Sequence, residues 1–245
     1  MRVFGATDVG CVRRDNQDCY AFRQMDDDTV VVVVCDGMGG AQAGSVASTI
    51  AVETFSTVVK TELASGIPDE PEAREDVLAN ACQRANRRVY ELSRENPGYR
   101  GMGTTLVAAL VLPDESYVVN VGDSRCYLLE RETIRQVTVD HSVVQLLVDR
   151  GEITAEEARV HPKKNLITRA LGVERTVSCD ILRVENGPGS RLLLCSDGLS
   201  NVLSDGVLAR ASAGESDPEL LCRKLLDMTL EQGAPDNVTI VLAQL

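Results

Sequence analysis

The chain of 245 residues contains no tryptophan, and its only other aromatic rings belong to five tyrosines and three phenylalanines. This scarcity argues against a site that stacks nucleotide bases on aromatic side chains. Positive charge is also scarce, because 25 Lys and Arg face 37 Asp and Glu, which gives a formal net charge of −12. Binding to nucleic acid or to an anionic membrane requires a basic face. The composition therefore argues against both kinds of partner.

Long apolar runs and closely paired cysteines are missing as well. The longest apolar run, residues 106–112, is far shorter than the ~20 residues of a membrane-spanning helix. The chain begins with mixed polarity and lacks the apolar core of a signal peptide, so we expect no membrane span and a cytoplasmic location. The eight cysteines include no CxxC pair, which argues against a zinc site and fits reduced thiols.

What is present is the composition of a folded domain, with 44% hydrophobic and 25% charged residues. Short apolar runs bounded by turn residues predict strands over residues 29–35, 105–112, 117–121, 126–129, 191–195 and 238–242. Two of these runs, Val30–Val34 and Leu192–Leu194, show no polar alternation. Such strands should be covered on both faces, by another sheet on one side and by helices on the other.

Apolar residues at helical spacing predict two long helices, over 42–63 and 72–92, which should pack antiparallel on a sheet face. A third helix should begin after Asp217, which is followed by proline at the first helical position. Within residues 140–172, two capping-box spacings predict two short helices in a small insertion.

Four aspartates that are far apart along the chain stand beside predicted strands, and a fifth ends the segment 13–18: Asp36, Asp123, Asp197 and Asp236, with Asp18. A single Asp-Gly pair is more typical of a turn than of a metal site. The prediction of a metal site therefore rests on the whole set of aspartates. Two carboxylates ~4 Å apart repel by ~4 kcal/mol at an effective dielectric of ~20, and bound divalent cations remove that repulsion. Oxygen ligands without nearby Cys or His pairs favour hard ions such as Mg²⁺ or Mn²⁺.

These aspartates belong to a longer series of motifs. Eight of them stand in order between residues 7 and 237: Thr7-Asp8-Val9-Gly10 with Arg13-x-x-Asn16-Gln17-Asp18, Asp36-Gly37-Met38-Gly39-Gly40, Gly103-Thr104-Thr105, Val121-Gly122-Asp123-Ser124-Arg125, Asp140-His141-Ser142, His161-Pro162 with Asn165 and Thr168-Arg169-Ala170-Leu171-Gly172, Ser196-Asp197-Gly198-Leu199, and Asp236-Asn237. Together they resemble the metal-dependent protein phosphatase family, protein phosphatase 2C, in its bacterial form.

The resemblance implies an α+β fold, a four-layer α-β-β-α sandwich of two antiparallel sheets flanked by helices. It implies one phosphatase catalytic domain over residues 1–245, with a flap subdomain over residues 140–172. The implied reaction is hydrolysis of phosphoserine and phosphothreonine on proteins, by direct attack of a water or hydroxide that bridges two Mn²⁺ or Mg²⁺ ions.

The resemblance also implies a role for each matched metal ligand. Asp36 bridges two ions, and the carbonyl of Gly37 binds one of them. Asp197 and Asp236 hold the other ion. Asp123, together with Asp197, forms the third and weaker metal site of the bacterial members.

The remaining matched residues concern the substrate and the flap. Asp18 orients metal-bound waters, and Arg13 clamps the substrate phosphate, for which a guanidinium fork is well suited. His161 and Arg169 belong to the flap, which we expect to influence substrate selection. The candidate proton donors are a metal-bound water and His161. For His161, a structural role at the end of a helix is an equally good explanation.

Two departures from the family pattern leave other functions open. Gln17 stands where many members have Glu, and Met38 stands where many eukaryotic members have His. A catalytically weak relative that acts as a binding or sensing module is therefore the main alternative, and a nucleotide phosphodiesterase is a third. We expect phosphorylated proteins as partners, including a cognate Ser/Thr kinase, and a monomeric chain.

Overall fold

A computed structural model describes residues 1–130 and 133–245. Two antiparallel sheets form its centre. The first sheet has the order β1 (Arg2–Asp8), β11 (Val238–Gln244), β10 (Arg191–Cys195), β7 (Arg125–Glu130) and β8 (Thr133–Gln136). The second has the order β2 (Asp18–Gln24), β3 (Val30–Met38), β5 (Leu106–Val111), β6 (Glu115–Val121) and β9 (Asp180–Glu185), with the short β4 (Gly103–Thr104) paired to β3.

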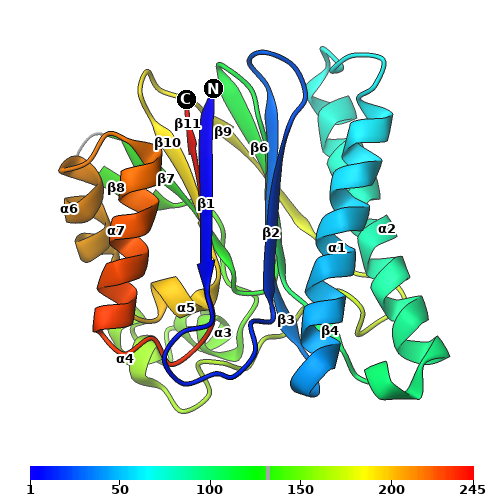
Figure 1. Cartoon of the computed structure of the whole chain (residues 1–245), viewed down its shortest axis with the longest axis vertical. Coiled ribbons are helices and arrows are strands. Elements are labelled where there is room, and N and C mark those ends of the chain that lie inside the picture. Colours follow the sequence, from blue (N-terminus) through cyan, green and yellow to red (C-terminus); the bar gives the residue numbers. More distant parts are fainter. Residues whose placement is uncertain (131–132) are drawn as a thin grey trace.

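Helices cover the outer faces of both sheets (Figure 1). Helices α1 (Gly40–Glu62) and α2 (Pro71–Glu95) pack on the second sheet, and α2 continues into the short 3-10 turn Pro97–Tyr99. The first sheet is covered by α5 (Asp197–Ser200), α6 (Asp205–Ala213) and α7 (Pro218–Glu231). The predicted four-layer α-β-β-α sandwich is confirmed.

The valine run of β3 explains how the layers are held together. Val31 and Val33 lie in the core between the second sheet and α1 and α2. Val32 and Val34 lie in the core between the two sheets. Successive side chains of a strand point to opposite faces, so a strand buried on both faces needs apolar residues without alternation. The same holds for β10, whose residues divide between the inter-sheet core and the core under α7.

The long helices follow the predicted apolar stripes. On α2 the buried positions include Leu78, Ala81, Ala85 and Val89, and Pro71 occupies the first turn. Helix α7 is capped by Asp217, whose Oδ1 accepts hydrogen bonds from the two amides that follow Pro218. Within the part of the chain that the structure describes, no helix has the length and apolar character needed to cross a bilayer.

Several elements differ from their predicted form. Strands β1, β8 and β9 and helix α6 were not predicted, since their residues are of mixed polarity and most of them are not buried. Strand β3 continues through Asp36 and Gly37 to Met38 because β4 pairs with its end. Of the two predicted capping boxes, Thr154 forms a complete one, whereas Ser142 only accepts the amide of its helix.

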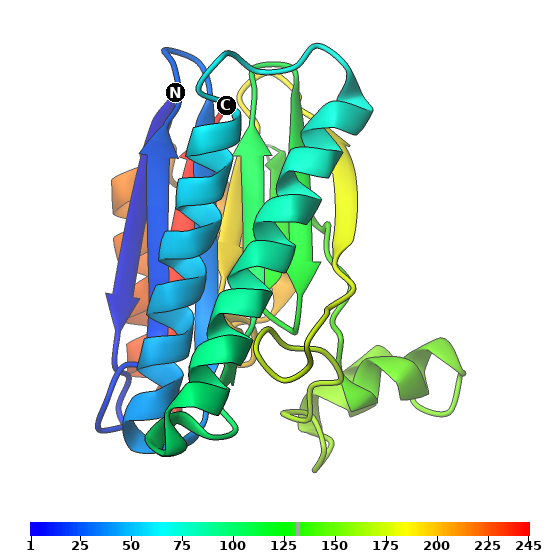
Figure 2. The ribbon, with the colours of Figure 1, turned by 90° about the vertical axis from the view of Figure 1, so that its right-hand side faces the viewer.

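Residues 140–172 contain two short helices, α3 (Val143–Asp149) and α4 (Ala155–Val160). This segment projects from the lower end of the sandwich in Figure 2. The same end carries the β1–β2 loop, the end of β3, the β6–β7 turn, the start of α5 and the start of β11. The five predicted aspartates lie on these segments, so the fold gathers them at one end.

Candidate metal centre

A cavity of about 480 Å³ opens at this end of the sandwich. Six of the predicted site residues line it: Arg13, Asp36, Gly37, Asp123, Asp197 and Asp236. Asp18 lies at the first residue of β2, directly opposite Asp36 in the register of β2 and β3. The carboxylates thus converge from the ends of several strands, as the sequence pattern indicated.

The end of β3 is fixed by hydrogen bonds to its neighbour. The amide of Asp36 donates to Thr105 Oγ1 at 2.9 Å, and the Asp36 carbonyl accepts from Thr104 Oγ1 at 2.8 Å. Gly37 is required by close backbone packing, because a Cβ there would lie 2.0 Å from the carbonyl oxygen of Gly44. The backbone that presents Asp36 and the Gly37 carbonyl is therefore rigid.

A second close approach joins the segments of Asp197 and Asp236. A Cβ on Gly198 would lie 1.9 Å from the carbonyl oxygen of Asn237, so only glycine allows the first turn of α5 to pack here. These two segments are more than 35 residues apart in the sequence. Their contact brings two of the predicted ligands to the same wall of the cavity.

Asn237 holds the loop that carries Arg13, a role that the sequence interpretation did not assign. Its Nδ2 donates to the carbonyls of Val9 and Asp15 at 2.9 and 3.0 Å, and its Oδ1 accepts from the amide of Gln17 at 2.8 Å. The side chain is buried. In the sequence, the position of Asn237 directly after Asp236 was the feature that could have indicated this role.

Burial and mutual repulsion raise the pKa values of four carboxyl groups. Burial raises the pKa of Asp18 to about 7, against the opposing effect of a hydrogen bond from Ser196. Burial and the charge of Asp197 raise the pKa of Asp123 to about 8. The pKa of Asp36 is raised well above its ordinary value by burial and by the neighbouring aspartates.

The same causes act on Asp197. Burial and the charge of Asp236 raise its pKa to about 6. Asp236 has a different environment, because its Oδ2 lies 2.7 Å from Nη2 of Arg13. A cluster of acids whose pKa values rise together is one that a cation would stabilise.

The oxygen atoms of the cluster are suited to a hard cation. Within residues 1–130 and 133–245, Oδ1 of Asp18 and Oδ1 of Asp197 are buried without a hydrogen-bond partner. Their second oxygens are held, by Ser196 Oγ at 2.7 Å and by Asn201 Nδ2 at 2.9 Å. Each of these carboxylates therefore has a fixed orientation and one free oxygen, as expected of a ligand for Mg²⁺ or Mn²⁺.

The described side chains do not form a complete ion cage as they stand. No group of three Asp, Glu, His or Cys residues in the described ranges has the spacing to hold an ion. Arg13 meanwhile occupies one oxygen of Asp236. Arg13 must release Asp236 for the Oδ2 of that residue to bind an ion.

The two predicted flap residues lie outside the cavity wall. Nδ1 of His161 accepts from the amide of Lys163 at 3.1 Å, just after the end of α4. Arg169 pairs with Asp180 of β9 at 2.7 Å. The structure thus gives His161 a contact within its own turn and gives Arg169 an ion pair with the second sheet.

A buried histidine connects Asp180 to the turn of Asp123. Nδ1 of His141 accepts from the amide of Gly122 at 3.1 Å, so the proton of the neutral ring lies on Nε2. That atom is 3.1 Å from Asp180 Oδ2. His141 therefore joins the β6–β7 turn to β9, although the sequence interpretation gave it no individual role.

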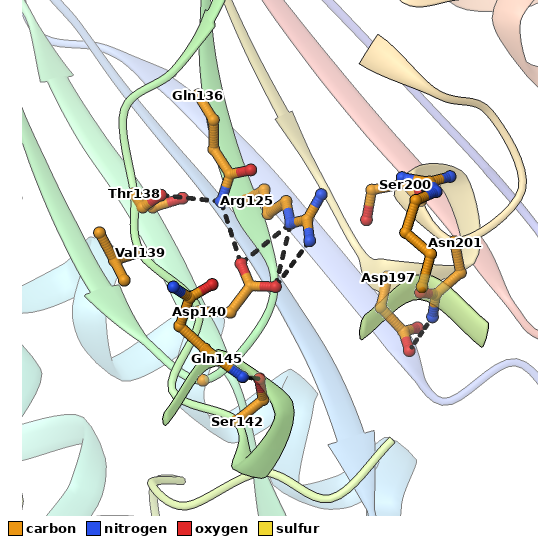
Figure 3. Close-up of polar contacts among 12 residues, drawn as sticks. Arg125, Gln136, Thr138, Val139, Asp140, Ser142, Gln145, Asp197, Ser200 and Asn201 are labelled. Carbon is orange, nitrogen blue, oxygen red and sulfur yellow. Dashed lines mark hydrogen bonds and ion pairs between the residues drawn. The ribbon is translucent and has the colours of Figure 1, made fainter. Parts of the chain in front are cut away.

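A second hollow, of about 430 Å³, shares Asp123 and Asp197 with the cavity and lies against α3 and α4. Figure 3 shows its polar wall. Arg125 binds both carboxylate oxygens of Asp140, with contacts of 2.7 to 3.1 Å. Arg159 of α4, which also lines this hollow, donates to the carbonyl of Ser200 at 3.1 Å. Residues 140–172 are thus attached to the first sheet and to α5.

A cavity rich in carboxylates, with an arginine at its wall, is typical of enzymes that hydrolyse phosphate esters with two metal ions. A profile of the protein phosphatase 2C family matches residues 13–219. This chain belongs to the protein phosphatase 2C family, which is metal-dependent. The expectation that the sequence motifs raised is therefore confirmed.

Known relatives agree over nearly the full chain. The serine/threonine phosphatase stp of Listeria monocytogenes (serotype 4b, strain F2365) is 37% identical over 97% of this chain and 93% of its own length. The crystal structure of Stp1 from Staphylococcus aureus has a TM-score of 0.91 at 36% identity, covering 99% of this chain and 94% of that chain. The catalytic domain of the serine/threonine phosphatase PstP, solved in complex with two manganese ions, has a TM-score of 0.83 at 34% identity, with 99% and 97% covered.

Proposed function

We propose that this chain is a protein serine/threonine phosphatase that hydrolyses phosphoserine and phosphothreonine on proteins. The main support is the cavity in which four predicted aspartates and Arg13 meet. The names of the relatives support the same reaction. Divalent ions, Mn²⁺ or Mg²⁺, would supply a water of lowered pKa and would neutralise charge on the phosphate.

The metal ligands are assigned from the placement of the carboxylates. Asp36 is the central ligand, supported by its position among the other acids, and the adjacent Gly37 carbonyl adds an oxygen. Asp197 and Asp236 hold the second ion. Asp123 and Asp197 form a third, weaker site. This assignment fits the electrostatic effect of Asp197, whose charge raises the pKa of Asp123.

The other residues of this chain bind and orient. Arg13 is exposed, and its guanidinium can leave Asp236 for two oxygens of a substrate phosphate. Asp18, with one oxygen fixed by Ser196, orients water in the site. Gln17 keeps the neighbouring loop in place, since its Nε2 donates to the Gly40 carbonyl at 2.7 Å.

Residues 140–172 serve as a flap subdomain within one catalytic domain over residues 1–245. The hollow between α3, α4 and α5 adjoins the cavity, so a peptide that carries the phosphate can contact the flap. We assign Arg169 the task of holding the flap base through Asp180. His161 ends α4, and its place outside the cavity wall does not favour a role as proton donor.

The cellular setting is proposed by analogy with the family. The substrates include a Ser/Thr kinase of the same cell, the protein works in the cytoplasm as a monomer, and it does not act on nucleic acid. The net charge of −12 supports the last point.

The proposal is tested by hydrolysis of p-nitrophenyl phosphate and of a phosphothreonine peptide, with Mn²⁺ titrated against a chelator. Asp36→Asn should abolish both activities while the far-ultraviolet spectrum stays unchanged. Asp27→Asn, in the exposed turn between β2 and β3, is the matched control and should keep full activity. Full wild-type activity in excess chelator would contradict a metal-dependent reaction. Metal binding without turnover would favour the alternative of a binding or sensing module.

A further inference from the structure

A groove of about 640 Å³ lies between α1 and α2, which form the outer layer over the second sheet (Figures 1 and 2). Its wall carries three arginines of α2, Arg84, Arg87 and Arg88, and one acid, Glu91. This excess of positive charge contrasts with the formal net charge of −12 of the whole chain. None of these residues takes part in the proposed phosphatase reaction.

Two of the three arginines are available to a ligand. All three are exposed, and Arg87 Nε pairs with Glu91 Oε1 at 2.7 Å. Among the described residues, neither Arg84 nor Arg88 forms an ion pair. Like charges four residues apart on a helix repel each other. An anion that binds between Arg84 and Arg88 would remove this repulsion.

Two amide side chains of the groove tie α2 to its neighbours. Asn80 Nδ2 donates to Glu62 Oε1 at the end of α1. Gln83 Nε2 donates to the carbonyl of Val177, in the segment that leads into β9. The helix that carries the arginines is therefore held in place, whereas the guanidinium groups themselves face solvent.

The groove lies within reach of a polypeptide that occupies the metal centre. Gly40, the first residue of α1, lines the metal cavity, and Thr54 of the same helix lines the groove. The 14 residues between them correspond to about 21 Å along the helix. An extended peptide covers this distance with about seven residues.

We propose that the α1–α2 groove is a docking site for a second phosphorylated side chain of the substrate polypeptide, distinct from the phosphate that is hydrolysed. Charge complementarity favours this occupant. A phosphorylated side chain carries about two negative charges and three acceptor oxygens, whereas a carboxylate carries one charge. The guanidinium forks of Arg84 and Arg88 match pairs of phosphate oxygens. The identity of the ligand as a substrate rests on the proposed function, whereas the binding of a phosphopeptide does not.

Binding is measured on the full chain in excess chelator by fluorescence anisotropy, with a labelled peptide that carries one phosphothreonine. The variant with Arg84→Gln and Arg88→Gln should bind about 10- to 100-fold more weakly, because hydrogen bonds to charged groups are lost. The matched control, Arg23→Gln with Arg210→Gln, removes the same charge from exposed residues of β2 and α6 and should bind like the wild type.

The nature of the ligand is tested with two further probes in the same assay. The peptide with glutamate in place of phosphothreonine should bind more weakly than the phosphopeptide. Inorganic phosphate should compete only at concentrations far above the Kd of the phosphopeptide. Equal affinity of the groove variant and the wild type for the phosphopeptide would overturn the proposal. Binding of inorganic phosphate as tight as that of the phosphopeptide would overturn the assignment to a polypeptide.

The role in turnover is tested with Mn²⁺ and a peptide that carries two phosphothreonines ten residues apart. In initial rates, the groove variant should raise KM about 10-fold and keep kcat. Its hydrolysis of p-nitrophenyl phosphate should be unchanged, because that substrate is too small to reach the groove. An equal loss on both substrates would overturn the docking role. A wild-type enzyme that hydrolyses neither substrate would instead contradict the proposed function and leave the anisotropy result in place.

Discussion

Replacement of Asp197 by asparagine should stabilise the metal-free protein at pH 8, although it removes a charge from the centre of the site. Burial and the charge of Asp236 raise the Asp197 pKa from 3.8 to about 6. At ~1.4 kcal/mol per pKa unit, ionisation of this group in the folded state costs at most about 3 kcal/mol. Asparagine avoids this cost and keeps an oxygen for the Asn201 Nδ2 that Asp197 binds at 2.9 Å.

The sign of the pH dependence follows from the raised pKa. The unfolded chain ionises near 3.8 and the folded chain near 6, so the wild type loses stability as pH rises through this window. Asp197→Asn should therefore approach wild-type stability as pH falls towards 4 and exceed it by up to about 3 kcal/mol at pH 8. This corresponds to roughly 6–12 °C in Tm at ~2–4 °C per kcal/mol.

The assay is thermal unfolding in excess chelator across this pH range, followed by circular dichroism. Asp27→Asn, in an exposed turn, is the control for a change of charge alone and should show no such gain. If Asp197→Asn is less stable than the wild type by the same amount at pH 5 and at pH 8, the electrostatic account of the cavity is refuted.

Four further outcomes are expected. Mn²⁺ should raise the wild-type Tm more at pH 8 than at pH 5.5, since ions displace protons from carboxylates; an equal shift would contradict this. Arg13→Ala should lower phosphopeptide kcat/KM by about 10- to 100-fold, because hydrogen bonds to charged groups contribute ~1.5–3 kcal/mol; unchanged kinetics would remove Arg13 from the site. Gly198→Ala should lower the unfolding midpoint, since a Cβ would lie 1.9 Å from Asn237 O; a neutral effect would contradict the close approach. His141→Ala should cost ~1–3 kcal/mol by leaving the Gly122 amide unpaired, which urea unfolding measures.

The layers and the aspartate cluster could be predicted because their signals are local. Val30–Val34 and Leu192–Leu194 lack polar alternation, and both strands are covered on two faces in the structure. Aspartates directly beside such strands must lie near the rim of a sandwich. That reasoning brought Asp36 and Asp197 to one cavity from opposite sheets.

The missed features depend on contacts between distant segments. Strand β9 buries only Val184 fully, and pairing with β6 determines its conformation. His141 contacts Gly122 and Asp180, which lie 19 and 39 residues away, so no local pattern marks its role. The proton-donor prediction for His161 came from the family motif alone, whereas its place at the end of a helix was also predicted and is found in the structure.

The central claim is that the gathered carboxylates hold a pair of divalent ions. A crystal soaked in Mn²⁺ and measured at the manganese absorption edge tests this most directly. We predict two anomalous peaks inside the cavity, within bonding distance of Asp36, Asp197 and Asp236. A map of the Mn²⁺-soaked crystal with ordered aspartates and no peak among them would contradict the account.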